Sequence, residues 1–147
     1  MSEPAAAPPP RTTVLFADPD HGPRAQMAES LLRAVDSTGT LQVASAGTVP
    51  GADLADVAEV LAERGVSFTP AHRALDMSMA PDLLIVVCEE GCAACPYLPR
   101  AARIVRWPME DPGTLHGEAR LEALRAIADR LGELSVGLLR RGAQVRA

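Results

Sequence analysis

The sequence predicts a three-layer α/β domain built on a four-stranded parallel sheet. Short apolar segments typical of strands alternate along the chain with segments of helical periodicity. The segment from Asp82 to Val87 is almost entirely apolar, which is typical of a strand covered on both faces. The length of 147 residues, 48% of them hydrophobic, fits one domain. We therefore expect right-handed crossovers and helices on both faces of the sheet.

The chain opens with a segment that cannot nucleate a core. Residues 1–11 are rich in proline and alanine, so we expect a flexible tail before a single domain over residues 12–147. Residues 12–17 are β-branched and aromatic and predict the first strand. After a tight loop, residues 22–35 predict a helix whose apolar face carries Met27, Leu31, Leu32 and Val35.

The next unit repeats this order of strand and helix. Residues 41–45 predict the second strand, and a turn is expected over residues 46–51. The following helix has apolar residues at helical spacing, namely Leu54, Val57, Ala58 and Leu61. Gly65 is expected to end this helix in a left-handed conformation.

The last part of the chain supplies two strands and a long helix. Residues 82–87 and 103–107 predict the third and fourth strands. From Gly117 a helix carries the apolar stripe Leu121, Leu124, Ile127, Leu131, Leu134 and Leu138. Ligands of parallel sheets bind outside the carboxyl ends of the strands, so the loops after Ala17, Val87 and Trp107 are the candidate sites.

Composition excludes several classes of function. The 14 basic residues, all arginine, face 19 acidic residues, and the net charge of −5 argues against nucleic acid and anionic membranes as partners. No apolar segment approaches the roughly 18 to 20 residues of a membrane helix, and the N-terminus lacks the pattern of a secretory signal. Three clustered cysteines do not form a disulfide framework, so we expect a cytoplasmic protein with reduced thiols.

The loop after the first strand carries a family resemblance. Residues 14–30 read VLFADPDHGPRAQMAES and resemble the opening of the low-molecular-weight protein tyrosine phosphatases and the related thioredoxin-coupled arsenate reductases. The signature of those enzymes is a strand, a C-x(5)-R loop and a helix. Further matches along the chain are Ser45-Ala-Gly-Thr48, His72-Arg73, Cys88, Cys95-Pro96, Trp107 and Asp111-Pro112. The resemblance implies a low-molecular-weight phosphatase-like fold, with the strands in the order 2-1-3-4, and a site for an oxyanion.

The loop departs from the family pattern at the nucleophile. It comprises Asp18, Pro19, Asp20, His21, Gly22, Pro23 and Arg24. Asp18 stands where the family has the attacking cysteine, whereas Arg24 matches the arginine that binds the oxyanion through paired hydrogen bonds. Pro19 and Pro23 each remove a backbone N–H that such a loop would aim at an anion. Ala25 replaces the serine that supports the thiolate in the family.

Two interpretations of Asp18 follow. Its carboxylate can fold back on the Arg24 guanidinium as a built-in anion, which leaves the site self-occupied. Alternatively, Asp18-Pro19-Asp20 resembles the first motif of haloacid-dehalogenase-type phosphatases, in which the first aspartate is phosphorylated. In that interpretation Glu110-Asp111 would have to hold magnesium, and a D-x-D tripeptide alone is a weak signal.

The cysteine segment allows three interpretations. Cys88 and Cys95 match the spacing of the two later cysteines in the arsenate reductase relay, so they form a candidate redox pair for a thioredoxin-like reductant. With Cys92 they also show the C-x(3)-C-x(2)-C spacing of an iron–sulfur site, which normally belongs to a larger barrel. Zinc would need a fourth ligand from His21, His72 or His116, none of which lies in the segment. We expect no metal and no cofactor.

The other matched residues have structural interpretations as well. Asp111 matches the general acid of the phosphatases, and it suits a turn or a helix N-cap equally well. Glu29 and Ser45 match an ion-binding network of the arsenate reductases, or they simply tie helix to strand. His72 and Arg73 are candidates for the mouth of the site.

Our leading hypothesis is a degenerate family member that binds a small oxyanion, a phosphorylated ligand or a protein partner at the altered loop, without phosphatase or arsenate reductase turnover. The motivating observation is that Asp18, Pro19, Asp20, Pro23 and Ala25 all differ from the family pattern. The alternative is an active enzyme. It would use thiol redox chemistry through Cys88 and Cys95, or hydrolysis with Asp18 in a new role.

Overall fold

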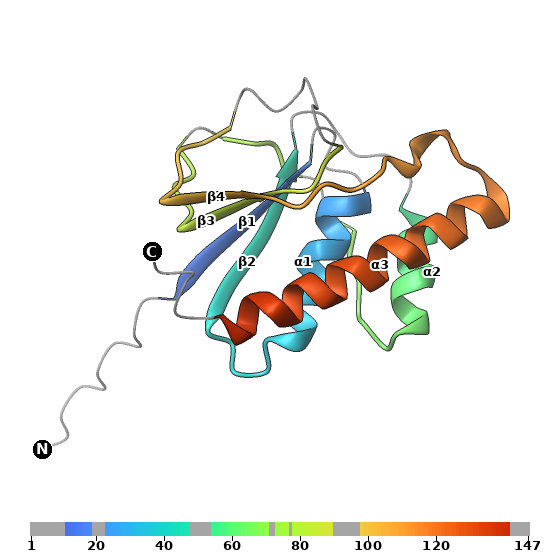
Figure 1. Cartoon of the computed structure of the whole chain (residues 1–147), viewed down its shortest axis with the longest axis horizontal. Helices are drawn as coiled ribbons and strands as arrows, with labels where there is room; N and C mark the ends of the chain where they lie inside the picture. Colours follow the sequence, from blue (N-terminus) through green and yellow to red (C-terminus); the bar gives the residue numbers. More distant parts are fainter. Residues whose placement is uncertain are drawn as a thin grey trace, which may run out of the picture.

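The computed structural model describes residues 11–18, 23–47, 54–70, 73–76, 78–89 and 98–141. Four strands form one parallel sheet in the order β2-β1-β3-β4, which confirms the predicted topology (Figure 1). The strands are β1 (Thr12–Asp18), β2 (Leu41–Gly47), β3 (Leu83–Val86) and β4 (Arg103–Arg106). The helices are α1 (Pro23–Val35), α2 (Ala55–Glu63), the 3-10 helix η1 (Pro112–Thr114) and α3 (Gly117–Arg140).

Alternate residues of the central strands enter two separate hydrophobic clusters, one on each face of the sheet. Val14 and Phe16 of β1 join the larger cluster, together with apolar residues of α1, α2 and α3. Leu15 and Ala17 join the smaller cluster on the other face. The sheet is therefore buried on both faces, and all of β3 is buried, as its continuous apolar sequence predicts.

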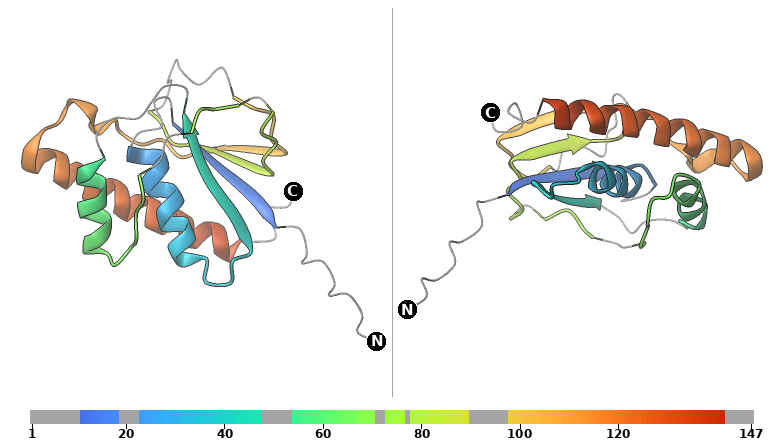
Figure 2. Two further views of the ribbon diagram at one scale, coloured as in Figure 1. Left: turned by 180° about the vertical axis from the view of Figure 1, so that it is seen from behind. Right: turned by 90° about the horizontal axis from the view of Figure 1, so that it is seen from below.

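In the part of the chain that the structure describes, the helices lie on one face of the sheet, whereas helices were expected on both faces. In the described part of the chain α1 and α3 pack side by side against the sheet, and α2 packs against both (Figure 2). The second face is covered by the non-helical segments that carry Leu75, Met79, Leu98 and Ala101. These segments contain prolines and no helical repeat of apolar residues, and their described residues, 73–76, 78–82 and 98–102, are not helical.

The positions of these layers follow from the handedness of the connections. The chain steps from β1 to β2 in one direction across the sheet and from β3 to β4 in the other. Right-handed crossovers then place the two connections on opposite faces. The helix α1 and the segment before β4 belong to opposite clusters, in agreement with this rule.

Most boundaries match the sequence prediction within one or two residues. The strand β2 continues through Ala46 and Gly47, where a turn was expected, because both residues extend the ladder opposite Ala17 and Asp18. Gly65 follows α2 with a φ of +70°, so the predicted left-handed helix end is confirmed. Residues 1–10 of the expected tail lie outside the described residues. No helix in the described part of the chain is long and apolar enough to span a membrane.

Candidate functional site

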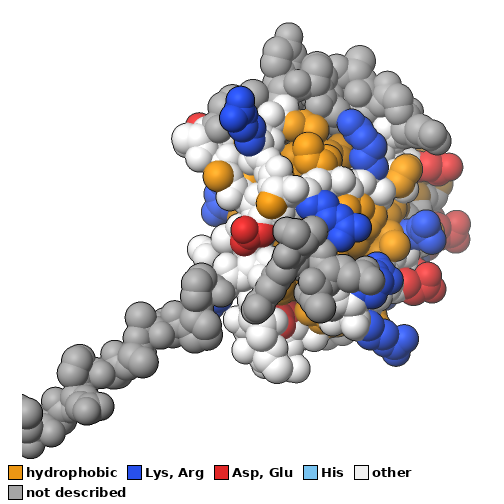
Figure 3. Space-filling view, turned by 60° about the vertical axis from the view of Figure 1, so that its left-hand side comes forward, with side chains coloured by type: hydrophobic (Ala, Val, Ile, Leu, Met, Phe, Trp, Pro, Cys, Tyr) orange, Lys and Arg blue, Asp and Glu red, His pale blue; other side chains and the backbone are white. Residues whose placement is uncertain are grey.

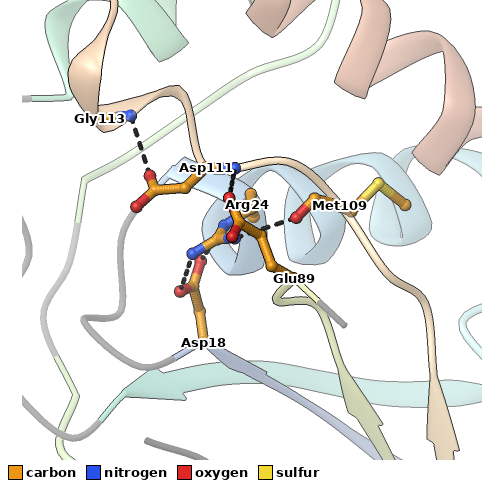
Figure 4. A network of polar contacts seen from close by, with 6 residues as sticks. All are labelled: Asp18, Arg24, Glu89, Met109, Asp111 and Gly113. Carbon is orange, nitrogen blue, oxygen red and sulfur yellow. Dashed lines mark hydrogen bonds and ion pairs between the residues drawn. The ribbon is translucent and has the colours of Figure 1, made fainter. Parts of the chain in front are cut away.

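Asp18 and Arg24 form a buried ion pair at the carboxyl end of β1. The Arg24 Nη2 donates to Asp18 Oδ1 at 3.0 Å, and Arg24 Nε donates to Asp18 Oδ2 at 3.2 Å (Figure 4). The side chains are 5% and 0% exposed, respectively. Two parallel hydrogen bonds between a planar guanidinium and a carboxylate are the geometry by which arginine binds a carboxylate or phosphate. The folding back of Asp18 on Arg24, one of the two interpretations from the sequence, is the arrangement observed.

The local sequence explains how the two side chains meet. Asp18 is the last residue of β1, and α1 begins at Pro23, where the fixed φ of proline suits the first helical position. Arg24 is the second residue of that helix and points back towards the strand end (Figure 4). The intervening loop residues Pro19, Asp20, His21 and Gly22 lie outside the described residues.

Arg24 also ties this strand end to the segment after β4. Its Nη1 donates to the backbone carbonyl oxygen of Met109 at 3.1 Å. Met109 is itself only 6% exposed and packs in the larger hydrophobic cluster. The guanidinium is therefore fixed on two sides, by a carboxylate from β1 and by a carbonyl two residues before Asp111.

Asp111 does not face the ion pair. Its Oδ1 accepts a hydrogen bond from the Gly113 N–H at 2.9 Å, so it caps η1, and Figure 4 shows its carboxylate turned towards Gly113. Its own backbone N–H donates to Glu89 Oε1 at 3.0 Å. The structure thus shows the helix N-cap arrangement for Asp111, and Glu89 links the segment after β3 to the segment after β4.

The electrostatics of the site follow from these contacts. Arg24 carries the positive charge that an oxyanion would need, and the Asp18 carboxylate already neutralises it in a water-excluded position. Removing either member of a buried ion pair leaves an unpaired charge, which costs about 3 to 5 kcal/mol. A dianion entering this position would have to displace Asp18 and then lie against its negative charge.

A second polar cluster links α1 to β2. Ser45 Oγ donates to Glu29 Oε1 at 2.7 Å, and Arg33 Nη1 pairs with Glu29 Oε2 at 2.8 Å. Arg33 Nη2 also donates to the carbonyl of Val43 at 2.6 Å. Glu29 and Ser45 therefore do tie helix to strand. The side chain of Arg73 donates to the Ser45 carbonyl at 3.4 Å, on the same edge of β2.

Of the candidate cysteines, only Cys88 belongs to the described part of the chain. It is buried, at 3% exposure, two residues after the end of β3. Cys92, Cys95 and His72 lie outside the described residues. Within the described residues no three His, Cys, Asp or Glu side chains are grouped as ligands for a metal ion.

The three segments that the sequence marked as candidates come together. Asp18, Glu89 and the Met109–Asp111 segment all lie at the carboxyl ends of the strands (Figure 4). Sequence reasoning missed the roles of Glu89 and of the Met109 carbonyl. A backbone acceptor has no signature in a sequence. Glu89 had one usable signal, since it is a carboxylate in the loop that follows the third strand.

Comparison with known proteins assigns the family. The family model for low-molecular-weight phosphotyrosine protein phosphatases matches residues 14–141. The chain belongs to this family. No curated protein sequence matches it.

Solved structures in this family resemble the chain over most of its length. An arsenate reductase from Archaeoglobus fulgidus is 31% identical, with 83% of this chain and 98% of the other covered and a TM-score of 0.65. A thioredoxin-dependent arsenate reductase from Corynebacterium glutamicum is 25% identical over 92% of this chain and 65% of the other, with a TM-score of 0.65. A tyrosine phosphatase from Erwinia amylovora is 20% identical over 89% and 93%, with a TM-score of 0.68.

Proposed function

We propose that this member of the phosphatase and arsenate reductase family is a pseudoenzyme that binds a ligand or protein partner around the altered loop. The observation that supports it is the buried Asp18–Arg24 pair, in which a carboxylate occupies the donors that would otherwise hold an oxyanion. The replacement of the cysteine removes the nucleophile as well. A small oxyanion or a phosphorylated group could bind only by displacing Asp18, so a partner that contacts the loop surface is favoured. A cytoplasmic location is part of this proposal.

The alternative enzymatic functions have less support. As a nucleophile, Asp18 would have to leave Arg24 and reach solvent, although its side chain is 0% exposed. A relay through Cys88 and Cys95 with a thioredoxin-like reductant would start from a buried thiol, and burial in apolar surroundings lowers the reactivity of cysteine. Neither function is favoured by a contact among the described residues.

The test is an assay of phosphatase and arsenate reductase activity with the wild type beside Asp18→Cys. We expect the wild type to hydrolyse no aryl phosphate and reduce no arsenate, with or without magnesium. Turnover by Asp18→Cys would show that the loss is local to residue 18. If this variant is also inert, the donors removed by Pro19 and Pro23 matter as much as the thiol. Wild-type turnover that disappears in Asp18→Asn would contradict the proposal.

A further inference from the structure

The outer edge of β4 is an unpaired strand edge. β4 is the last strand of the sheet and pairs only with β3 (Figure 1). The Arg103 N–H donates to Asp82 O at 3.1 Å and the Trp107 N–H donates to Val86 O at 2.9 Å, so these residues direct their backbone groups towards β3. Parallel strands alternate the direction of these groups, and Ile104 and Arg106 therefore direct theirs outward. Such an edge is a template for another strand.

The side chains along this edge are basic and apolar. Arg103, Ile104 and Arg106 are exposed, and Ile104 is 50% exposed, the largest value among the large hydrophobic residues of the described chain. On the helix side of the edge, Arg103 and Arg141 line a small cavity of about 70 Å³ together with Val105, Trp107 and Leu138. Figure 3 shows a face on which arginine side chains stand beside exposed hydrophobic side chains.

The charges of Arg106 and Arg141 are not balanced by acidic side chains in the described part of the chain. The ion pairs found there involve Arg24, Arg33, Arg64, Arg120 and Arg125. The carboxylate next to the start of β4, that of Asp82, is turned towards β1, where it accepts hydrogen bonds from Thr13 N at 2.8 Å and Thr13 Oγ1 at 3.1 Å. The protein as a whole carries a net charge of −5, whereas the side chains along this edge are basic.

We propose that the β4 edge binds an extended acidic peptide segment of a partner protein, which adds a fifth strand to the sheet. Backbone groups of Ile104 and Arg106 would supply the main-chain hydrogen bonds, and the exposed Ile104 side chain would pack against an apolar residue of the peptide. Acidic side chains of the peptide would pair with Arg106 on one face of the sheet and with Arg141 on the other.

The same charges exclude a second copy of this chain as the occupant. Antiparallel pairing of two β4 strands would bring Arg103 and Arg106 of one copy next to those of the other. Like charges on opposing strands destabilise a sheet. A nucleic acid fits less well than a peptide, because its phosphates would use the arginines and leave the backbone groups of β4 and Ile104 without partners.

The test uses the full chain and two eight-residue peptides, one that repeats Glu-Glu-Val-Val and one that repeats Lys-Lys-Val-Val, so that each face of the added strand carries both charged and apolar side chains. We expect the acidic peptide to bind and to slow hydrogen exchange at the backbone amides of Ile104 and Arg106. Its affinity should fall as the salt concentration rises. The lysine peptide should not bind. Hydrogen exchange is measured on the wild type, so this result does not depend on whether a variant folds.

Two variants distinguish binding at the β4 edge from nonspecific attraction of the acidic peptide to exposed arginines. Arg106→Glu combined with Arg141→Glu should weaken the acidic peptide by about tenfold or more, since two attractive contacts become repulsive. Arg130→Glu is the matched control, because Arg130 is exposed on α3 beside a different pocket, and it should leave affinity unchanged. Binding without protection of the two amides, equal binding of the lysine peptide, or preferential binding of single-stranded DNA would overturn the proposal. None of these results depends on activity at Asp18.

Discussion

At the scale of single residues, the buried ion pair makes Arg24 a stabilising residue as well as a site residue. Arg24→Ala leaves the Asp18 carboxylate buried without its partner, so we expect the free energy of unfolding to fall by about 3 kcal/mol. Urea unfolding measures this. Arg64→Ala removes a largely exposed pair with Asp129 and should cost less than about 1 kcal/mol. Equal effects of the two substitutions would show that the Asp18–Arg24 pair is not buried as described.

Ser135 gives a prediction of the opposite sign. It lies on α3 at 0% exposure, and its hydroxyl has no hydrogen-bond partner in the described structure. Removing an unsatisfied buried polar group relieves its desolvation cost, so Ser135→Ala should raise the free energy of unfolding by about 1 to 2 kcal/mol. Ser30→Ala on α1, at a half-buried helical position, is the control for helix propensity. A gain at Ser135 no larger than that at Ser30 would contradict this explanation.

At the scale of elements, substitutions at two glycines distinguish the effect of backbone conformation on stability from the effect of side-chain packing. Gly65 ends α2 with a φ of +70°, and a Cβ there would meet nothing within 4 Å. Gly65→Ala should therefore destabilise the protein by about 1 to 2 kcal/mol through backbone conformation alone. Gly132→Ala, inside α3 with equally open space, should be stabilising by up to about 1 kcal/mol. Thermal unfolding of both variants checks the contrast, and changes of the same sign would contradict it.

The turn between α1 and β2 gives a prediction of pH dependence. Burial would raise the pKa of Asp36, but hydrogen bonds from the Leu41 N–H, from Thr40 and from Thr38 hold it below its ordinary value of 3.8. A lowered folded pKa contributes stability that is present above the unfolded value and is lost as the pH falls through the folded value. Asp36→Asn should therefore be less stable than the wild type at neutral pH, by about 1 kcal/mol.

The difference between Asp36→Asn and the wild type should shrink as the pH falls below 3.8. Urea unfolding at a series of pH values measures it. A constant difference from neutral to acid pH would mean that the carboxylate is not held by these hydrogen bonds.

At the scale of the whole molecule, periodicity was enough to predict the four strands and the three α-helices of the described chain, whereas the strand order was expected from the family resemblance. Strand residues such as Val14 and Leu15 alternate between two buried faces, and that pattern is visible in the sequence. What covers the second face could not be predicted, because Leu75 and Leu98 lie in segments without a helical or strand repeat. The contact of Arg24 with the Met109 carbonyl joins residues 85 positions apart and has no sequence pattern.

Asp18 and Arg24 could be singled out in advance, because the family resemblance implies that they stand at the positions of the cysteine and the arginine. Their two hydrogen bonds support the proposal that the Asp18 carboxylate occupies the Arg24 donors that would otherwise hold an oxyanion.

The most direct test of whether Asp18 occupies the site is the binding of inorganic phosphate, measured by calorimetry, to the wild type, Asp18→Ala and Asp111→Asn. We expect no saturable binding to the wild type and none to Asp111→Asn, because the Asp111 carboxylate caps η1 and does not block Arg24. Asp18→Ala frees the Arg24 guanidinium and should bind phosphate. Phosphate binding to the wild type as tight as to Asp18→Ala would contradict the claim that Asp18 occupies the site.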